Sequence, residues 1–143
     1  MKQVKAYGTK VVNAPLEELT ISRRSLRPSD VEFEVLYCGI CHSDLHSIKG
    51  DFGEPFLPLV PGHEILGRVT AIGADVKDFQ VGELVGVGCI VGSCGHCDSC
   101  HEGLEQFCDE GVTFSFNSAD KISGGQTFGG FSKTYVCEDK YIL

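Results

Sequence analysis

Apolar and polar residues alternate along several short stretches of this chain. In VEFEVLY, residues 31–37, the apolar side chains from Val31 to Tyr37 fall on one face, whereas Glu32 and Glu34 fall on the other. Alternation of this kind is typical of a strand with one buried face. Similar patterns bounded by turn residues predict four more strands, over 18–22, 64–73, 82–88 and 130–137.

Helical patterns are few and short. A capping signal at Ser43 and Asp44, followed by Gly50, predicts a helix over 43–49, and the stretch 100–107 predicts a second one. Glycine makes up 18 of the 143 residues, which indicates frequent reversals of the chain. Many short strands with glycine turns predict a mainly β fold, either a small barrel or a sandwich, in one domain long enough to bury a core.

The charge and the cysteine content exclude several classes of protein. With 12 Lys and Arg against 20 Asp and Glu, the net charge of −8 repels a phosphate backbone, so we expect no nucleic-acid partner. The chain has no apolar run of about 20 residues, the length that crosses a bilayer, and no signal-peptide pattern at its start. We therefore expect a cytoplasmic protein without a membrane partner. In a reducing cytosol, its eight cysteines favour thiols and metal ligands over disulfides.

Half of these cysteines lie in one loop with the spacing C-x2-C-x2-C-x7-C. A loop this short can wrap a tetrahedral zinc ion, with Zn–S distances of about 2.3 Å, and it leaves no ligand position for a substrate. We expect a structural zinc site; an iron–sulfur cluster, disulfides and free thiols are the alternatives. His96 and His101 lie inside the loop and are expected to be solvated bystanders. The four cysteines are Cys94, Cys97, Cys100 and Cys108.

Two further motifs carry donors suited to a metal. Cys38 and Cys41 form a C-x-x-C motif, which by itself is compatible with a redox pair or with half of a zinc site. Further along, Gly62, His63 and Glu64 form a GHE triplet. Without context, the favoured explanation of the triplet is a turn glycine, a satisfied core histidine and a surface glutamate. Neither motif decides the function alone.

Taken in order, these motifs resemble those of one enzyme family. The stretches YCGICHSDLH (37–46), PLVPGHEILGRV (58–69), the four-cysteine loop and FGGFSKTYV (128–136) resemble the zinc-dependent alcohol dehydrogenases of the medium-chain dehydrogenase/reductase group. The sequences of these motifs are most similar to those of the cinnamyl-alcohol-dehydrogenase branch and its microbial aldehyde reductases. The resemblance runs from roughly Val4 to Leu143. It implies a GroES-like, partly open β-barrel with short helices and a zinc-binding loop.

The resemblance also implies a catalytic metal and a cofactor. By correspondence with the family motifs, Cys41 and His63 are ligands of a catalytic zinc ion, and Glu64 is an occasional or exchanging ligand. Zinc with an open position polarises an aldehyde or acidifies an alcohol, and NAD or NADP exchanges the hydride with the substrate. The implied partner is a small alcohol or aldehyde, with NADPH as the reductant in the branch that the chain most resembles. A homodimer of the complete enzyme is compatible with this assignment.

Four residues beside Cys41 take their roles from the same resemblance. Ser43 corresponds to the hydroxyl that relays the proton and contacts the cofactor, and His46 corresponds to the imidazole that passes the proton to solvent. Asp44 corresponds to a carboxylate that orients a ligand histidine, and His42 to a contact with the cofactor pyrophosphate. The alternatives are a helix cap for Ser43 and Asp44 and a plain surface position for His46.

Other residues near these motifs carry weaker expectations. Three cysteines in or beside strand patterns are expected to be buried thiols, namely Cys38, Cys89 and Cys137. Three apolar residues before the GHE triplet correspond either to the lining of the family's substrate pocket or to ordinary packing, namely Phe52, Phe56 and Leu57.

One expected part of the family pattern is absent from the sequence. No strand–turn–helix carries a G-x-G-x-x-G motif, and GVGCIVG (86–92) runs directly into the cysteine loop. The resemblance therefore implies that residues 1–143 form the N-terminal part of a catalytic domain, with a zinc lobe at 89–110. The Rossmann cofactor domain and the family's third cysteine ligand then lie outside it, and the isolated chain is expected to be inactive. The alternatives are a stand-alone zinc-folded GroES-like binding module and a thiol redox protein built on Cys38 and Cys41.

Overall fold

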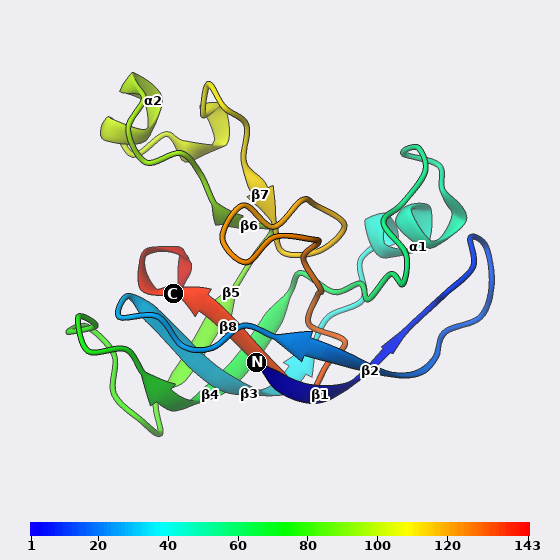
Figure 1. Ribbon diagram of the computed structural model, residues 1–143, viewed down its shortest axis with the longest axis horizontal. Helices are drawn as coiled ribbons and strands as arrows, with labels where there is room; N and C mark the ends of the chain where they lie inside the picture. The colour runs from blue at the N-terminus through cyan, green and yellow to red at the C-terminus, as the bar shows by residue number, and fades with distance from the viewer.

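The computed structural model describes all residues, Met1 to Leu143, as short strands with few helical turns (Figure 1). The strands pair in three antiparallel sheets that do not close into a barrel, which confirms the predicted mainly β, partly open fold. The strands are β1 (Lys2–Gly8), β2 (Glu17–Arg23), β3 (Asp30–Cys38), β4 (Ile65–Ile72), β5 (Leu84–Val87), β6 (Ile90–Gly92), β7 (Thr113–Phe114) and β8 (Thr134–Glu138). The helical segments are α1 (His42–Lys49), α2 (Asp98–His101) and the 3-10 turns η1 (Glu105–Phe107) and η2 (Asp139–Tyr141).

The larger core packs on the four-stranded sheet, whose strand order is β5-β4-β3-β8. Val31 and Phe33 of β3 are fully buried, as their alternation predicts, and each contributes about 1.5–3 kcal/mol through burial. Tyr37 was predicted on the same face, and that prediction is wrong, because its side chain is 72% exposed. A register shift between Val35 and Tyr37 reverses the alternation at the end of β3.

A separate two-stranded ribbon, β1 paired with β2, carries the second core. This core consists of Val4, Ala6, Leu19, Ile21 and Val60. The sequence predicted β2 but not β1, β6 or β7. In β1 the alternation is present, but its inward positions are Val4, Ala6 and Gly8, of which only Val4 is a large apolar residue. This is a weak signal without the partner strand.

Only one of the two predicted helices forms over its predicted range, and neither α-helix is long and apolar enough to cross a membrane. Helix α1 matches the predicted range, although its N-cap is Cys41 and Asp44 occupies the third helical position of a capping box. The predicted helix over 100–107 is wrong. Gly103, with a φ of +73°, interrupts it and separates α2 from η1.

The strand predicted over 130–137 begins only at Thr134. The preceding segment instead lies against the GHE triplet, where the backbone amides of residues 129–131 donate to the carbonyls of residues 60–62 at 2.7–3.0 Å. Because these amides already have partners, the segment cannot extend the ladder between β8 and β3. The contact fixes the backbone on which His63 is placed.

The segment 89–110 extends away from the four-stranded sheet and is joined to it through β6 and β7 (Figure 1). Helix α1 lies in a different part of the molecule, beyond the end of β3. The two groups of predicted metal ligands therefore lie in separate regions of the fold.

Candidate metal centres

The four cysteines of the loop form one compact cluster, which we call the closed sulfur site (Cys94, Cys97, Cys100 and Cys108). All four sulfur atoms lie within 4.8 Å of one another, and the Sγ atoms of Cys94 and Cys100 are 3.8 Å apart. A tetrahedron with Zn–S bonds of about 2.3 Å has edges of about 3.8 Å. All eight cysteines of the chain are free thiols. The donor set and its spacing fit a tetrahedral ion such as zinc.

Backbone amides and a neighbouring hydroxyl support thiolates in this site. The amide of Cys97 donates to Cys94 Sγ at 3.3 Å, and the amide of Cys94 donates to Cys108 Sγ at 3.3 Å. A hydrogen bond from Ser93 lowers the pKa of Cys100 to about 6, whereas, against the hydrogen bonds from backbone amides, desolvation and the neighbouring thiols raise the pKa of Cys94 to about 11. Because metal ligands must be deprotonated, these donors favour the form that binds an ion.

The two histidines of the loop do not join the four sulfurs. His96 is exposed and pairs with Glu110, with His96 Nε2 2.8 Å from Glu110 Oε1. Together with Cys94 these two side chains form an alternative three-donor group, but it shares the Cys94 sulfur and is not an independent site. His101 is exposed at the end of α2.

A second group of donors, which we call the open centre (Cys41, His63 and Glu64), joins residues from two segments. One ligand atom from each side chain lies within 4.8 Å of the others. Cys41 is the N-cap of α1, whereas His63 and Glu64 directly precede β4. The fold therefore brings together the three residues that the family resemblance selected, in a thiolate, imidazole and carboxylate set that suits zinc.

Asp44 connects the two segments of the open centre. Its carboxylate is 1% exposed and accepts hydrogen bonds from the backbone amides of Cys41 and Gly62, each at 2.9 Å. Asp44 Oδ1 also lies 3.3 Å from His63 Nδ1. The helix-cap interpretation of Asp44 is confirmed, and the same carboxylate lies where it could also orient His63, as the family resemblance implies. A proton on Nδ1 leaves His63 Nε2 free to bind a metal.

Ser43 is the hydroxyl of the open centre. Its Oγ lies 3.2 Å from Cys41 Sγ and 3.4 Å from His63 Nε2. The hydrogen bond from Ser43 is the main cause that lowers the pKa of Cys41 below its usual value. Ser43 therefore lies beside two of the predicted ligands, Cys41 and His63.

His42 and His46 lie outside this cluster on the exposed side of α1. His46 Nδ1 is 2.7 Å from Asp51 Oδ2, and no hydrogen bond joins His46 to Ser43. His42 is exposed and its ring lies against that of His46. The side chains of this chain alone therefore do not form a continuous hydrogen-bonded relay from Ser43 to His46.

Two glycines are required for the backbone to pass close to the open centre. A side chain at Gly39 would collide with the carboxylate of Glu64, which folds back over this position. Gly62 has a φ of +104° and lies against Phe131 and Cys38, so it lacks both the conformation and the space for a side chain.

The remaining cysteines only partly match the expectation of buried thiols. Cys137 is buried, and Cys38 is half-buried, with burial raising its pKa to about 11. Cys38 Sγ points to the carbonyl of Gly39 and not to a partner sulfur. The prediction is wrong for Cys89, which is exposed because it lies just before β6 and borders a pocket.

That pocket opens beside the open centre and has a volume of about 430 Å³. Ser43 and His63 form the polar side of this pocket. Phe52 also lines it, which agrees with the first of its two expected roles, pocket lining or ordinary packing. Phe56 and Leu57 do not line it and are exposed. The other lining residues are Ser47, Cys89, Phe114, Ser115, Phe116 and Asn117.

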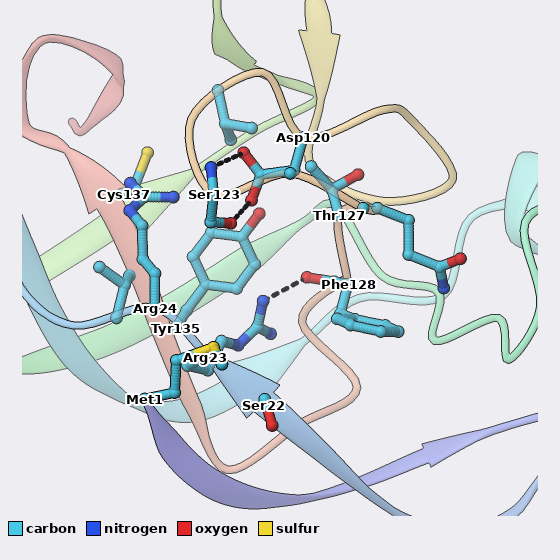
Figure 2. A pocket seen from close by; sticks show the side chains of 15 residues that line it. Met1, Ser22, Arg23, Arg24, Asp120, Ser123, Thr127, Phe128, Tyr135 and Cys137 are labelled. Atoms are coloured by element: carbon cyan, nitrogen blue, oxygen red, sulfur yellow. Dashed lines mark hydrogen bonds between the residues drawn. The ribbon is translucent and has the colours of Figure 1, made fainter.

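Arg23 is a residue near the site that the sequence analysis missed. It lines a second cavity of about 300 Å³, beside Tyr135 (Figure 2), and none of the predicted site residues borders that cavity. Its guanidinium donates to the carbonyls of Phe128, Gly129 and Thr134 at 2.6–3.0 Å and to Ser132 Oγ at 2.7 Å. Burial lowers the pKa of Arg23 to about 10.

These bonds hold the segment 128–134, which in turn bonds to the backbone of residues 60–62 directly before His63. Arg23 thus supports a ligand that it does not touch. A signal was present in the sequence, because Arg23 occupies an inward position of β2, on the same face as Leu19 and Ile21. A buried arginine in an apolar register requires polar partners.

Comparison with known proteins places these features in a family. The family model for the alcohol dehydrogenase GroES-like domain matches residues 27–143. The chain belongs to this family. The GroES-like domain found here is 46% identical over 141 residues to the aldehyde reductase YahK of Escherichia coli, covering 99% of this chain and 40% of that protein.

Two other similar proteins agree. The NADP-dependent alcohol dehydrogenase C of Mycobacterium tuberculosis is 46% identical over 143 residues, which are 100% of this chain and 41% of that protein. A cinnamyl alcohol dehydrogenase structure from Sorghum bicolor superposes with a TM-score of 0.95 at 38% identity, covering 99% of this chain and 40% of that one. The predicted family and branch are confirmed, and the GroES-like domain spans about two fifths of the length of these relatives.

Proposed function

We propose that this chain is the N-terminal part of the catalytic domain of a zinc-dependent alcohol dehydrogenase or aldehyde reductase that uses NADP(H). In this proposal residues 1–143 form the GroES-like domain, and residues 89–110 form a lobe folded around structural zinc. The enzyme interconverts small primary alcohols and aldehydes. The NADP preference is supported by the name of the mycobacterial relative. Location in the cytoplasm follows from the same proposal.

The observation that carries the proposal is the open centre with its hydroxyl. Cys41, His63 and Glu64 converge, and Ser43 Oγ lies within 3.4 Å of two of these ligands. A scaffold that only bound a structural metal would have no need of a hydroxyl at this point. By contrast, the closed sulfur site has four cysteine sulfurs and no position for a substrate.

The residues of the open centre have distinct tasks in this chemistry. When bound, zinc supplies Lewis acidity at the substrate oxygen, and the nicotinamide supplies or accepts the hydride. Cys41 and His63 hold the ion, and Asp44 fixes the orientation of His63 through Nδ1. Ser43 Oγ holds the proton that the substrate hydroxyl loses or gains, because a serine hydroxyl donates and accepts a hydrogen bond at once. His46, paired with Asp51, is the outlet to solvent, and His42 is the contact for the cofactor pyrophosphate.

The pocket beside the centre favours an apolar, flat substrate. Phe52, Phe114 and Phe116 line it, and the ring of Phe116 stacks on the ring of His63 at 5.6 Å between centroids. Aromatic walls with one polar side are typical of pockets that orient a small organic ligand. The substrate carbonyl then faces Ser43 and His63, while its apolar part packs on the phenyl rings.

This chain contributes three donors to the open centre, and one of them, Glu64, is an exposed carboxylate. We therefore expect the isolated domain to hold an ion there weakly and to turn over no substrate. The closed sulfur site is expected to keep its ion. Elemental analysis after desalting against a mild chelator should give about one zinc per chain, and two tightly held ions would contradict this part of the proposal.

Cobalt substitution tests the proposed function directly on the chain. Co²⁺ added after chelation should enter the open centre, and benzaldehyde or benzyl alcohol should then shift its visible bands. The Cys41→Ser variant should lose these bands, whereas Cys89→Ser, whose thiol belongs to neither ligand set, should keep them. If cobalt binds but neither ligand moves the bands, the binding-module alternative is favoured.

The thiol redox alternative has less support. The pKa of Cys38 is raised to about 11 by burial, which makes it a poor attacking thiol. Cys41 contacts Ser43 and His63 instead of Cys38. Thiol titration separates the two cases, because a metal ligand is masked until chelation and a redox pair forms a reversible disulfide.

A further inference from the structure

Helix α1 presents two imidazoles on one exposed face. His42 and His46 are four residues apart, the spacing at which helical side chains become neighbours. Their ring centroids are 4.8 Å apart and the ring planes are tilted by 37°. Two imidazoles that share one metal ion, with metal–nitrogen bonds of about 2.0–2.1 Å, place their ring centres roughly 5 Å apart. The ring centres are thus at a separation compatible with chelation, and rotation of the exposed His42 side chain can turn one of its nitrogens towards an ion on His46.

The end of the helix supplies a carboxylate to this pair. Gly50 adopts the left-handed conformation, with a φ of +78°, so the chain turns back and the Asp51 amide bonds to the carbonyl of His46 at 3.0 Å. This turn places Asp51 Oδ2 2.7 Å from His46 Nδ1. A carboxylate on Nδ1 fixes the tautomer in which Nε2 is free, the arrangement that commonly supports metal-binding histidines.

The surroundings also favour a bound cation. Neither ring nitrogen of His42 has a hydrogen-bond partner within the chain, so both are available. Phe52 packs on His46 with ring centroids 5.2 Å apart and restricts its rotation. The net charge of −8 attracts cations to the surface in general.

We propose that His42 and His46 chelate a divalent transition ion, such as Zn²⁺, Ni²⁺ or Cu²⁺, at a third site distinct from the closed sulfur site and the open centre. Asp51 positions His46 for this purpose and does not need to bind the ion. Water completes the coordination. An imidazole pair with a carboxylate behind it suits these ions better than Mg²⁺ or Ca²⁺, which prefer oxygen.

The site has a consequence that rests on the proposed function. An ion on Nε2 of His46 occupies the nitrogen that the proposal uses as the outlet for the proton, and an ion on His42 occupies the proposed cofactor contact. Excess zinc is therefore expected to inhibit the enzyme by a route that does not involve loss of the catalytic ion.

Nickel binding to the zinc-loaded chain tests the site without substrate or cofactor. Because the open centre also accepts divalent ions, the experiment uses a Cys41→Ser background, in which that centre lacks its thiolate. Equilibrium dialysis with elemental analysis of this background should find about one Ni²⁺ per chain in addition to zinc, and the variants that follow are made in it. His42→Gln and His46→Gln should each weaken nickel binding by more than tenfold, and Asp51→Asn by roughly tenfold, the usual effect of removing a carboxylate behind a ligand histidine. His101→Gln, which removes an exposed histidine elsewhere, should bind nickel like the parent chain.

Paramagnetic broadening by substoichiometric Cu²⁺ shows where the first ion binds. The chain has five histidines, and in the same Cys41→Ser background the ring signals of His42 and His46 should broaden before those of the other three. Earlier broadening of His63 or His96, or equal nickel binding by His42→Gln and His101→Gln, would overturn the proposal. Neither the nickel nor the copper experiment involves catalysis. A negative result in them would therefore reject the histidine site alone and would leave the cobalt test of the proposed function unaffected.

Discussion

The closed sulfur site and the open centre differ in how far apart their ligands lie in the chain. All four ligands of the closed sulfur site fall within residues 94–108, whereas the open centre joins Cys41 at the start of α1 to His63 and Glu64 before β4. A local site needs only its own loop to form. A site made from two segments depends on every contact that fixes one segment relative to the other, and here those contacts are Asp44 and the turn held by Arg23.

This difference between the two sites suggests different roles, with the closed sulfur site stabilising the fold and the open centre serving the proposed chemistry. Under the proposed function, the closed sulfur site saturates a tetrahedral ion with cysteine, so the binding energy of that ion goes into folding the loop. The open centre combines different donors with a hydroxyl and a pocket, and we expect the ion proposed there to exchange more readily. Mutations that remove support from one site should leave the other unchanged if the two are independent.

The largest expected effect comes from breaking the closed sulfur site. Structural zinc contributes roughly 10–16 kcal/mol of apparent binding energy in small zinc-folded units. Cys100→Ser should therefore unfold the loop and abolish tight zinc binding. Hydrogen exchange should report this locally: the amides of Leu104 and Phe107, both bonded within the loop, should lose protection, while the Val69 amide in the sheet keeps it.

The matched control for this variant is Cys89→Ser. Cys89 is an exposed thiol outside both ligand sets, so its replacement should leave zinc content and loop protection unchanged. Protection of the loop that survives in Cys100→Ser would show that the metal is not what folds it.

The next largest effect is expected from Arg23, which supports the backbone before His63 without touching the open centre. Arg23→Met removes four hydrogen bonds and leaves the carbonyl of Phe128 unpaired, whereas Ser132 Oγ still reaches the carbonyls of Gly129 and Thr134. At about 1 kcal/mol for each lost bond, we expect a loss of about 3–4 kcal/mol in the free energy of unfolding. Urea denaturation measures it. Weaker cobalt binding at the open centre should accompany the loss, with the zinc content of the closed sulfur site unchanged.

The contrast with a surface arginine sharpens this result. Arg68 is exposed and donates only to the carbonyl of Gly82, so Arg68→Met should change the unfolding free energy by about 1 kcal/mol or less. Equal effects of the two substitutions would remove the assigned role of Arg23.

Asp44→Asn tests the direct link between the two segments of the open centre. Asparagine keeps the volume of the side chain but lacks the negative charge of the carboxylate. In the parent chain this carboxylate accepts hydrogen bonds from the amides of Cys41 and Gly62 and lies next to His63 Nδ1. We expect a loss of about 2–3 kcal/mol in unfolding free energy, because hydrogen bonds to charged groups are the stronger ones. Cobalt affinity at the open centre should fall roughly 10–100-fold, the range for partners behind a ligand histidine. Asp78→Asn, at an exposed position without a hydrogen-bonded carboxylate, is the control.

The sequence predicted the features that depend on neighbouring residues. The cysteine spacing, the alternation over Val31 and Phe33, and the helix that ends before Gly50 are all local, and the structure contains each of them. The ligand set of the open centre came from a family resemblance, because no local pattern says that Cys41 meets His63.

What the sequence did not predict depends on distant partners. Tyr37 turns outward because the pairing of β3 with β4 shifts register, and a register shift has no signature in one strand alone. Arg23 is explained by carbonyl groups more than 100 positions away. The strand predicted from residue 130 starts late because its amides are taken by residues 60–62.

The smallest expected effect concerns a buried ion pair that serves neither metal site. Asp30 is fully buried at the start of β3 and accepts hydrogen bonds from Arg24 and Arg27. Burial alone would raise its pKa, but the two arginines lower it to about 2, from 3.8. A carboxyl group with a lowered folded-state pKa stabilises the fold above the unfolded value, and this contribution is lost as pH falls from about 4 through about 2.

The shift corresponds to about 2 kcal/mol. The unfolding free energies of the parent and Asp30→Asn should therefore differ most above pH 5 and converge by that amount towards pH 2, as measured by urea denaturation across this range. Because both proteins carry the same metal ligands, protonation of cysteine and histidine cancels in the difference. A gap that stays constant with pH would show that the ion pair contributes through packing alone, and a gap that widens in acid would reverse the assigned sign of the pKa shift.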